Sequence, residues 1–107
     1  MSRQELIELV GKVIIKIDVL RADFPRTSRE RRELDDIRDL LDTAQRQIVR
    51  NTIKTNTKAF KEKADELASS NKALNRTLRD VADVADKLEA FRNFLGSLQG
   101  LVGLITP

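Results

Sequence analysis

Residues 58–95 read KAFKEKADELASSNKALNRTLRDVADVADKLEAFRNFL, and this stretch decides the fold class. Its apolar residues recur at alternating spacings of three and four, which places them on one stripe of an α-helix. The stripe comprises Phe60, Ala64, Leu67, Leu74, Leu78, Val81, Ala85, Leu88 and Leu95, with Asn71 and Arg92 as polar positions. Because no Gly or Pro interrupts the register, the pattern predicts one helix over 58–95. Asn71 is interpreted as a polar core position that fixes the helix register.

Two shorter helices are predicted before this one, over residues 3–23 and 28–50. The first stripe comprises Leu6, Val10, Val13, Ile17, Leu20 and Phe24, and Ile15 points away from it. Pro25 ends this helix, and Thr27 with Glu30 has the spacing of a capping box, so the second helix starts near Ser28. The second stripe comprises Leu34, Ile37, Leu41, Ala44 and Ile48. Because polar Asn51 and Thr55 take its next positions, a break is predicted at 51–57.

The three predicted helices define an all-α fold, an elongated three-helix bundle with coiled-coil character in a single domain over 1–107. Gly96 is expected to end the third helix and leave a short apolar tail over 96–107. A helix of 38 residues would overhang two shorter ones, and a second copy would cover the overhang most simply. The apolar ending at Pro107 suggests a domain excised from a longer chain.

The composition excludes several classes of site. The 107 residues include no Cys and no His, which removes disulfides, thiolate or imidazole metal sites, and nucleophiles that depend on either residue. Carboxylates recur at helical spacing as Asp35, Asp39 and Asp42 and as Asp80, Asp83 and Asp86, but charge pairing explains them better than a metal site. We therefore expect no enzyme, no cofactor and no small-molecule substrate. An enzyme would need a buried carboxylate or lysine that the pattern does not show.

The location of the chain is predicted from its charged positions. Charged residues interrupt the first 25 positions as they would not in a signal peptide, so the expected location is cytoplasmic. The longest uncharged stretch, 93–107, has fifteen residues, whereas a bilayer-spanning helix needs about twenty apolar ones.

Positive charge is concentrated in residues 43–63, which hold six Lys or Arg and one Glu. We call Arg46, Arg50, Lys54, Lys58 and Lys61 the basic ridge, and Lys63 lies beside it. These cations either complement the negative end of a helix or form a docking surface for an anionic partner. A nucleic-acid partner is disfavoured, because single-strand binding uses aromatic platforms and this stretch offers only Phe60. The arginine run at 29–32 is interpreted as a surface paired with acids four residues on.

Residues 94–105 form the most apolar segment, in which Gly96 and Gly100 have a small-x-x-x-small spacing. The segment either folds back to seal the bundle or enters a membrane interface or a partner protein.

Two hypotheses about function follow. The leading one is a non-enzymatic module for interaction or oligomerisation, whose partner is a second copy or a helical protein. It presents a hydrophobic seam formed by Leu67, Leu74, Leu78, Val81, Ala85 and Leu88. The alternative is a membrane-docking or membrane-active domain that uses the basic ridge within 46–63 and the apolar segment 94–105. Its contact residues would be Arg46, Arg50, Lys54, Lys58, Lys61, Phe94, Leu95, Leu98 and Leu101.

Overall fold

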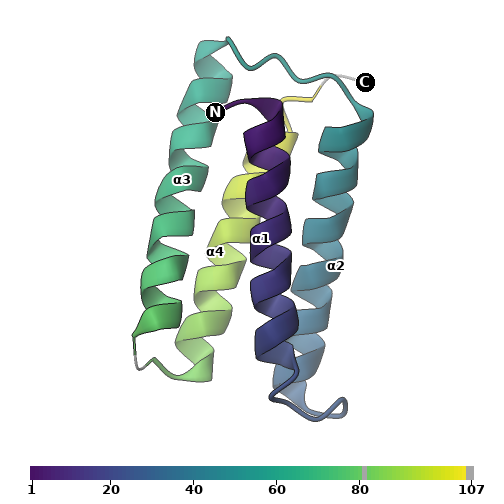
Figure 1. Ribbon diagram of the computed structural model, residues 1–107, viewed down its shortest axis with the longest axis vertical. Helices are drawn as coiled ribbons and strands as arrows, with labels where there is room; N and C mark the ends of the chain where they lie inside the picture. Colours follow the sequence, from purple (N-terminus) through teal and green to yellow (C-terminus); the bar gives the residue numbers. More distant parts are fainter. Residues whose placement is uncertain (81, 106–107) are drawn as a thin grey trace.

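The computed structural model describes residues 1–80 and 82–105, and within these residues the chain forms four α-helices and no strand (Figure 1). The helices are α1 (Arg3–Arg21), α2 (Arg29–Arg50), α3 (Lys58–Arg79) and α4 (Val84–Val102). Their bundle measures 41 × 25 × 17 Å along its principal axes. The predicted all-α class is confirmed, but the three-helix architecture was wrong. Coiled-coil character stays a prediction.

The predicted helix over 58–95 is two helices joined by a turn. The first ends at Arg79, and Asp80 has an extended backbone as its C-cap. Asp83 caps the next helix, because its side-chain oxygen accepts a hydrogen bond of 2.9 Å from the N–H of Asp86. The chain therefore folds back on itself here as an antiparallel helix pair, and the expected overhang does not exist.

The expected tail at 96–107 is largely the second half of α4, which continues through Gly96 and Gly100 to Val102. A glycine inside a helix costs about 1 kcal/mol relative to alanine. Four large apolar side chains in this half are buried, and the burial of each stabilises the fold by about 1.5–3 kcal/mol. They are Phe94, Leu95, Leu98 and Leu101. The helix continues because hydrophobic burial outweighs the two unfavourable glycines.

The other three helices each begin at a hydroxyl cap. Ser2, Ser28 and Thr57 each accept a hydrogen bond of 3.1 Å from the N–H three residues on. Ser28 thus caps α2 in place of Thr27, which the sequence had favoured. Residues 51–57 separate α2 from α3, which confirms the predicted break.

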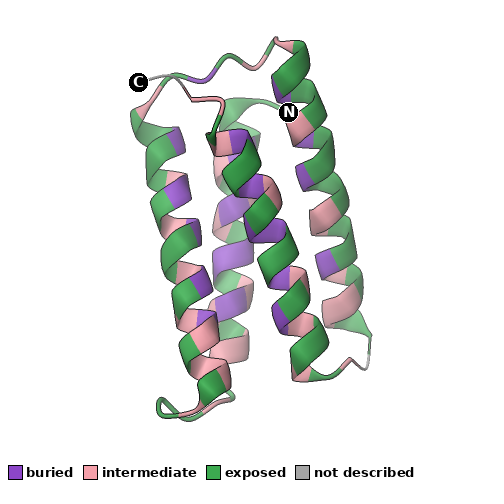
Figure 2. Cartoon of the chain, turned by 180° about the vertical axis from the view of Figure 1, so that it is seen from behind, coloured by how far each residue is buried: buried purple, intermediate pink, exposed green. Residues whose placement is uncertain are grey.

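The four helices form two antiparallel pairs, α1 with α2 and α3 with α4, and α2 packs against α4 to join them (Figure 1). Consecutive helices alternate in direction, so α2 and α4 run parallel. The connection at 51–57 crosses the end of the bundle from α2 to α3, and Ile53 within it is buried. Buried side chains line the inner faces of all four helices (Figure 2).

Polar contacts fix α1 against α2 along its length. At one end the Nε of Arg3 donates to the carbonyl of Ile48 at 3.0 Å, and at the other Arg38 pairs with Asp18 at 2.6 Å. Between α1 and α3, the ammonium of Lys16 donates to the side-chain oxygen of Asn75. Among the described residues, the backbones of α1 and α3 lie further apart than those of the packed pairs α1–α2, α2–α4 and α3–α4. The front helix α1 is therefore held mainly by α2.

Candidate interaction surface

The predicted hydrophobic seam lies mostly inside the core of its own chain. Leu67, Leu74 and Leu88 are buried, and Leu78 is half-buried against the same core. Ala85 is exposed on α4, and Val81 lies outside the described residues. The break between α3, which ends at Arg79, and α4, which starts at Val84, explains this placement, because α4 folds the second part of the stripe back toward the first. The buried leucines belong to the core of their own chain and are closed to a second chain in this fold.

The basic ridge lies at the end of the bundle where α2 finishes and α3 starts. Arg46 pairs with Asp42 at 2.9 Å, and Lys58 approaches Glu62 at 3.8 Å. Its other members, Arg50, Lys54 and Lys61, are exposed and form no ion pair with the described part of the chain. These five residues are divided among a helix end, a loop and a helix start, so they do not form one continuous helical row.

The apolar segment 94–105 contributes to the bundle core. Its four proposed membrane contacts, Phe94, Leu95, Leu98 and Leu101, are all buried, and Leu104 and Ile105 pack partly against the same core. These side chains would have to leave the core to enter a membrane. No helix in the described part of the chain is both long enough and apolar enough to cross a bilayer.

The predicted pairing of the arginine run is confirmed for Arg29, which contacts Glu33 at 3.2 Å. The same acid also pairs with Arg92 of α4 at 3.0 Å. Asp35 lies between two arginines, and its pKa is held below the usual value of 3.8, chiefly by a hydrogen bond from Arg21 and further by Arg31. Asp35 is therefore an ion-pair residue of the α1–α2 contact.

The remaining pKa shifts also have structural causes. A hydrogen bond to Asp18 raises the pKa of Arg38 above its usual value. Partial burial lowers the pKa of Lys16, and the positive charge of Lys12 lowers it further. Within the described ranges, no group of three or more acidic residues is placed to hold a metal ion.

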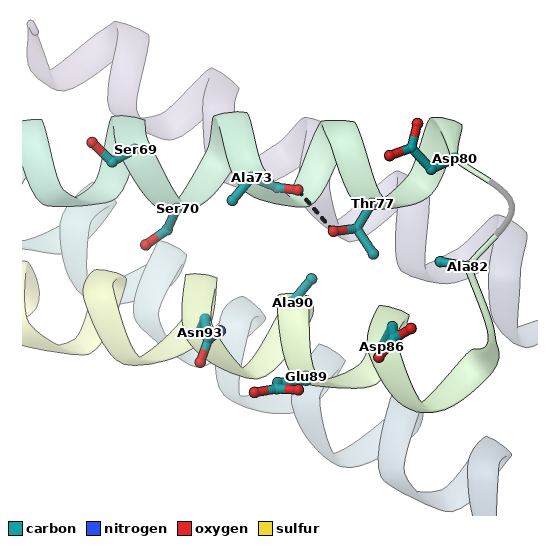
Figure 3. A pocket seen from close by; sticks show the side chains of 10 residues that line it. All are labelled: Ser69, Ser70, Ala73, Thr77, Asp80, Ala82, Asp86, Glu89, Ala90 and Asn93. Atoms are coloured by element: carbon teal, nitrogen blue, oxygen red, sulfur yellow. Dashed lines mark hydrogen bonds between the residues drawn. The ribbon is translucent and has the colours of Figure 1, made fainter.

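A groove of about 510 Å³ lies between α3 and α4, near the turn that joins them (Figure 3). Small side chains face each other across it, with Ser70 and Ala73 on α3 opposite Ala90 on α4. Asp86 and Glu89 line the α4 side, which makes the groove acidic. Its residues are suited to contact a cationic group, but the groove is open and has no buried polar group aimed into it.

The outer face of α1 carries an exposed apolar pair that the sequence analysis only partly identified. Ile15 is 62% exposed and Val19 is 69% exposed, and they lie one helical turn apart. The pattern had placed Ile15 away from the core stripe, and this is confirmed. The exposure of Val19 was not predicted, although its position four residues after Ile15 places it on the same outward face. Among the described residues, these are the only two large exposed apolar side chains that share one helix face.

Comparisons of the chain with protein-family models, with curated proteins and with solved structures give no match.

Proposed function

We propose that this protein is a non-enzymatic helical interaction module whose docking surface is the outer face of α1. The observation that carries the proposal is the exposed pair Ile15 and Val19. Two β-branched residues on one face of a surface helix have a cost in water that a partner helix would remove. A single exposed apolar residue is ordinary on a protein surface. Two that are aligned on one helix face, opposite the core, form a small apolar patch of the kind found at interaction sites.

The packing of the core supports a surface role for this pair. The core consists of apolar residues from all four helices and includes neither Ile15 nor Val19, so neither is required to complete it. The contacts of α1 with α2 use the flank of α1, through Asp18 and Arg21, and leave the outer face uncovered. The outer face is thus available without any rearrangement of the bundle.

Site-specific photo-cross-linking tests the proposal. A photoreactive amino acid replaces Ala22, which is exposed on the same side of α1 and leaves the apolar pair intact. A matched variant carries it at Lys72, on the exposed face of α3. In the purified chain and in cells that produce it, we expect cross-linked products from position 22 only, and their loss when Ile15→Asp is added. Equal products from both positions, or none from position 22, would refute the proposal.

The membrane-docking alternative keeps one supporting observation, the exposed and unpaired cations of the basic ridge. Arg50, Lys54 and Lys61 form no ion pair within the described part of the chain, so they are available to anionic headgroups. Each such residue near an anionic surface contributes about 1 kcal/mol. Co-sedimentation with vesicles containing phosphatidylserine tests this alternative.

The matched variant replaces Arg50, Lys54 and Lys58 with Gln. If the ridge docks on a membrane, the parent sediments with the vesicles and the variant binds severalfold more weakly, with less dependence on salt. If the ridge only complements helix ends, the variant loses about 0.3–1 kcal/mol of stability per residue at low salt. No vesicle binding by the parent would end the membrane hypothesis.

A further inference from the structure

Opposite charges flank the exposed apolar pair of α1 at nearly equal distances. Lys12 lies three residues before Ile15, and Asp23 lies four residues after Val19. Both charged side chains are exposed. Asp18 and Arg21, on the same helix, are paired within the chain, whereas Lys12 and Asp23 form no ion pair with any described residue. Two charges of opposite sign, neither paired with a described residue, thus flank the aligned apolar pair Ile15 and Val19.

The two charges also lie on the same side of the apolar pair. At about 100° per residue along α1 from Lys12 to Arg21, and about 100–120° per residue in the turn after it, Asp23 comes to within about 20–60° of Lys12 around the axis. α1 ends at Arg21, and the turn that follows keeps a helical sense, because Ala22 has helical dihedral angles and the N–H of Asp23 donates to the carbonyl of Leu20, three residues before it, at 3.1 Å. Lys12, the apolar pair and Asp23 therefore form one row along the outer face.

This row is complementary to itself when a second copy runs antiparallel. A two-fold axis between Ile15 and Val19 would bring each of them opposite the other residue of the second copy. The same axis brings Lys12 opposite the second copy's aspartate at position 23, and the reverse pair forms by symmetry. A parallel arrangement would instead place lysine opposite lysine and aspartate opposite aspartate, which like-charge repulsion disfavours.

We infer that the partner of the α1 face is a second copy of this chain, docked through antiparallel packing of α1 on α1. The inference rests on the proposed function and names its partner. The position of α1 allows this approach, because it is the nearest helix when the bundle is viewed down its shortest axis (Figure 1). One helix face per copy buries less than about 1,200 Å², the range of weak interfaces. The expected dissociation constant of the dimer is therefore on the order of tens of micromolar or higher.

Charge reversal tests the pairing. Lys12→Glu or Asp23→Lys alone places like charges in both pairs, and each is expected to raise the dimer dissociation constant about fivefold or more at low salt. The double variant restores opposite charges and should return the constant to near the parental value. Lys72→Glu on α3 is the control for Lys12→Glu, because it lowers the net charge by the same amount at an exposed position outside the α1 face. Sedimentation equilibrium against the 12.2 kDa monomer measures the constant, and circular dichroism checks the fold.

Cross-linking tests the orientation, since the chain has no cysteine and an introduced thiol is unique. Lys12→Cys and Asp23→Cys chains are mixed in equal amounts and treated with a short thiol cross-linker. Antiparallel packing predicts mixed products joining positions 12 and 23 in excess over those joining identical positions. An excess of 12–12 and 23–23 products would overturn the antiparallel arrangement.

The outcomes separate this inference from the proposed function. A parent that stays monomeric to about 1 mM, far above the weak-interface range, overturns the second copy as partner. If position 22 then cross-links to a different protein in cells, the proposed docking face stands with another occupant. If position 22 gives no product, both proposals fail. If the double variant has a dimer dissociation constant as high as those of the single variants, the proposed charge pairing is wrong.

Discussion

Replacing Asn71 with leucine should stabilise the fold. Asn71 lies on the core stripe of α3, between Leu67 and Leu74, and its side-chain oxygen is buried without a hydrogen-bond partner among the described residues. A buried unpaired acceptor costs about 1–3 kcal/mol. Leucine has the same branching and number of non-hydrogen side-chain atoms but no polar group. Because the residue as a whole is only half-buried, we expect Asn71→Leu to gain about 1–2 kcal/mol, the lower part of that range.

Asn75 provides a matched control one turn further along the same helix. Its side-chain oxygen accepts a hydrogen bond from the ammonium of Lys16. Asn75→Leu removes this acceptor and leaves Lys16, whose pKa is already lowered by burial, without its partner. The expected loss is about 0.5–1.5 kcal/mol, the usual contribution of one hydrogen bond. The same substitution at two neighbouring asparagines should thus have effects of opposite sign.

Urea unfolding followed by circular dichroism measures both variants. The expected order of unfolding free energy is Asn71→Leu above the parent and the parent above Asn75→Leu. For a domain of this size, a gain of 1 kcal/mol corresponds to about 4–8 °C in Tm. If Asn71→Leu unfolds more easily than the parent, the buried oxygen has a stabilising partner and the reasoning fails. If the variant is more stable but melts without cooperativity or changes mass, Asn71 fixes the register as the sequence suggested.

Three further outcomes are expected from the same assays. Leu74→Ala, at a fully buried position, should cost about 2–5 kcal/mol, while Ile15→Ala should stay within about 0.5 kcal/mol, and equal losses would show that the core is misplaced. Gly96→Ala should gain about 0.5–1 kcal/mol, because an added Cβ meets nothing within 4 Å, whereas Gly11→Ala should gain less, because its Cβ would lie 3.4 Å from a glutamine amide. The pKa of Asp35 is lowered on folding, so its stabilising effect is complete above the usual pKa of 3.8 and is lost as pH falls below it. Asp35→Asn should accordingly flatten acid unfolding in that range, and an unchanged profile would contradict the ion-pair role.

The helices before residue 80 could be predicted because their local signals agree. The stripe of α2, from Leu34 to Ile48, ends where Asn51 would have to be buried, and the structure ends the helix at the preceding residue. Hydroxyl residues precede α2 and α3 and accept hydrogen bonds there, as capping preferences require. The outward direction of Ile15 followed from its helical position alone.

The break between α3 and α4 could not be predicted from periodicity. Four residues separate the end of α3 at Arg79 from the start of α4 at Val84, close to one turn of helix, so the apolar spacing from Leu78 to Ala85 to Leu88 is unchanged across the break. It also contains no Gly or Pro, the residues used to identify breaks. The available signal for a new helix was Asp83 followed by Asp86, an N-cap residue with an acidic residue three positions later. The uninterrupted apolar stripe favoured a single helix instead. Gly96 led to the opposite error, a helix end predicted where α4 continues. Burial of the neighbouring apolar side chains stabilises the helix by more than the glycine destabilises it.

That single turn changes the basis for self-association. With one helix over 58–95, a second copy was needed to cover an overhang of apolar residues. With α3 and α4 folded together, Leu67, Leu74 and Leu88 are buried within one chain, so these stripe residues do not need a second copy to cover them. In the dimer that we propose, association would depend on the surface pair Ile15 and Val19, which the core does not need. An interface of that size would be weak and reversible, so the proposal predicts a folded monomer at low concentration and a dimer at high concentration.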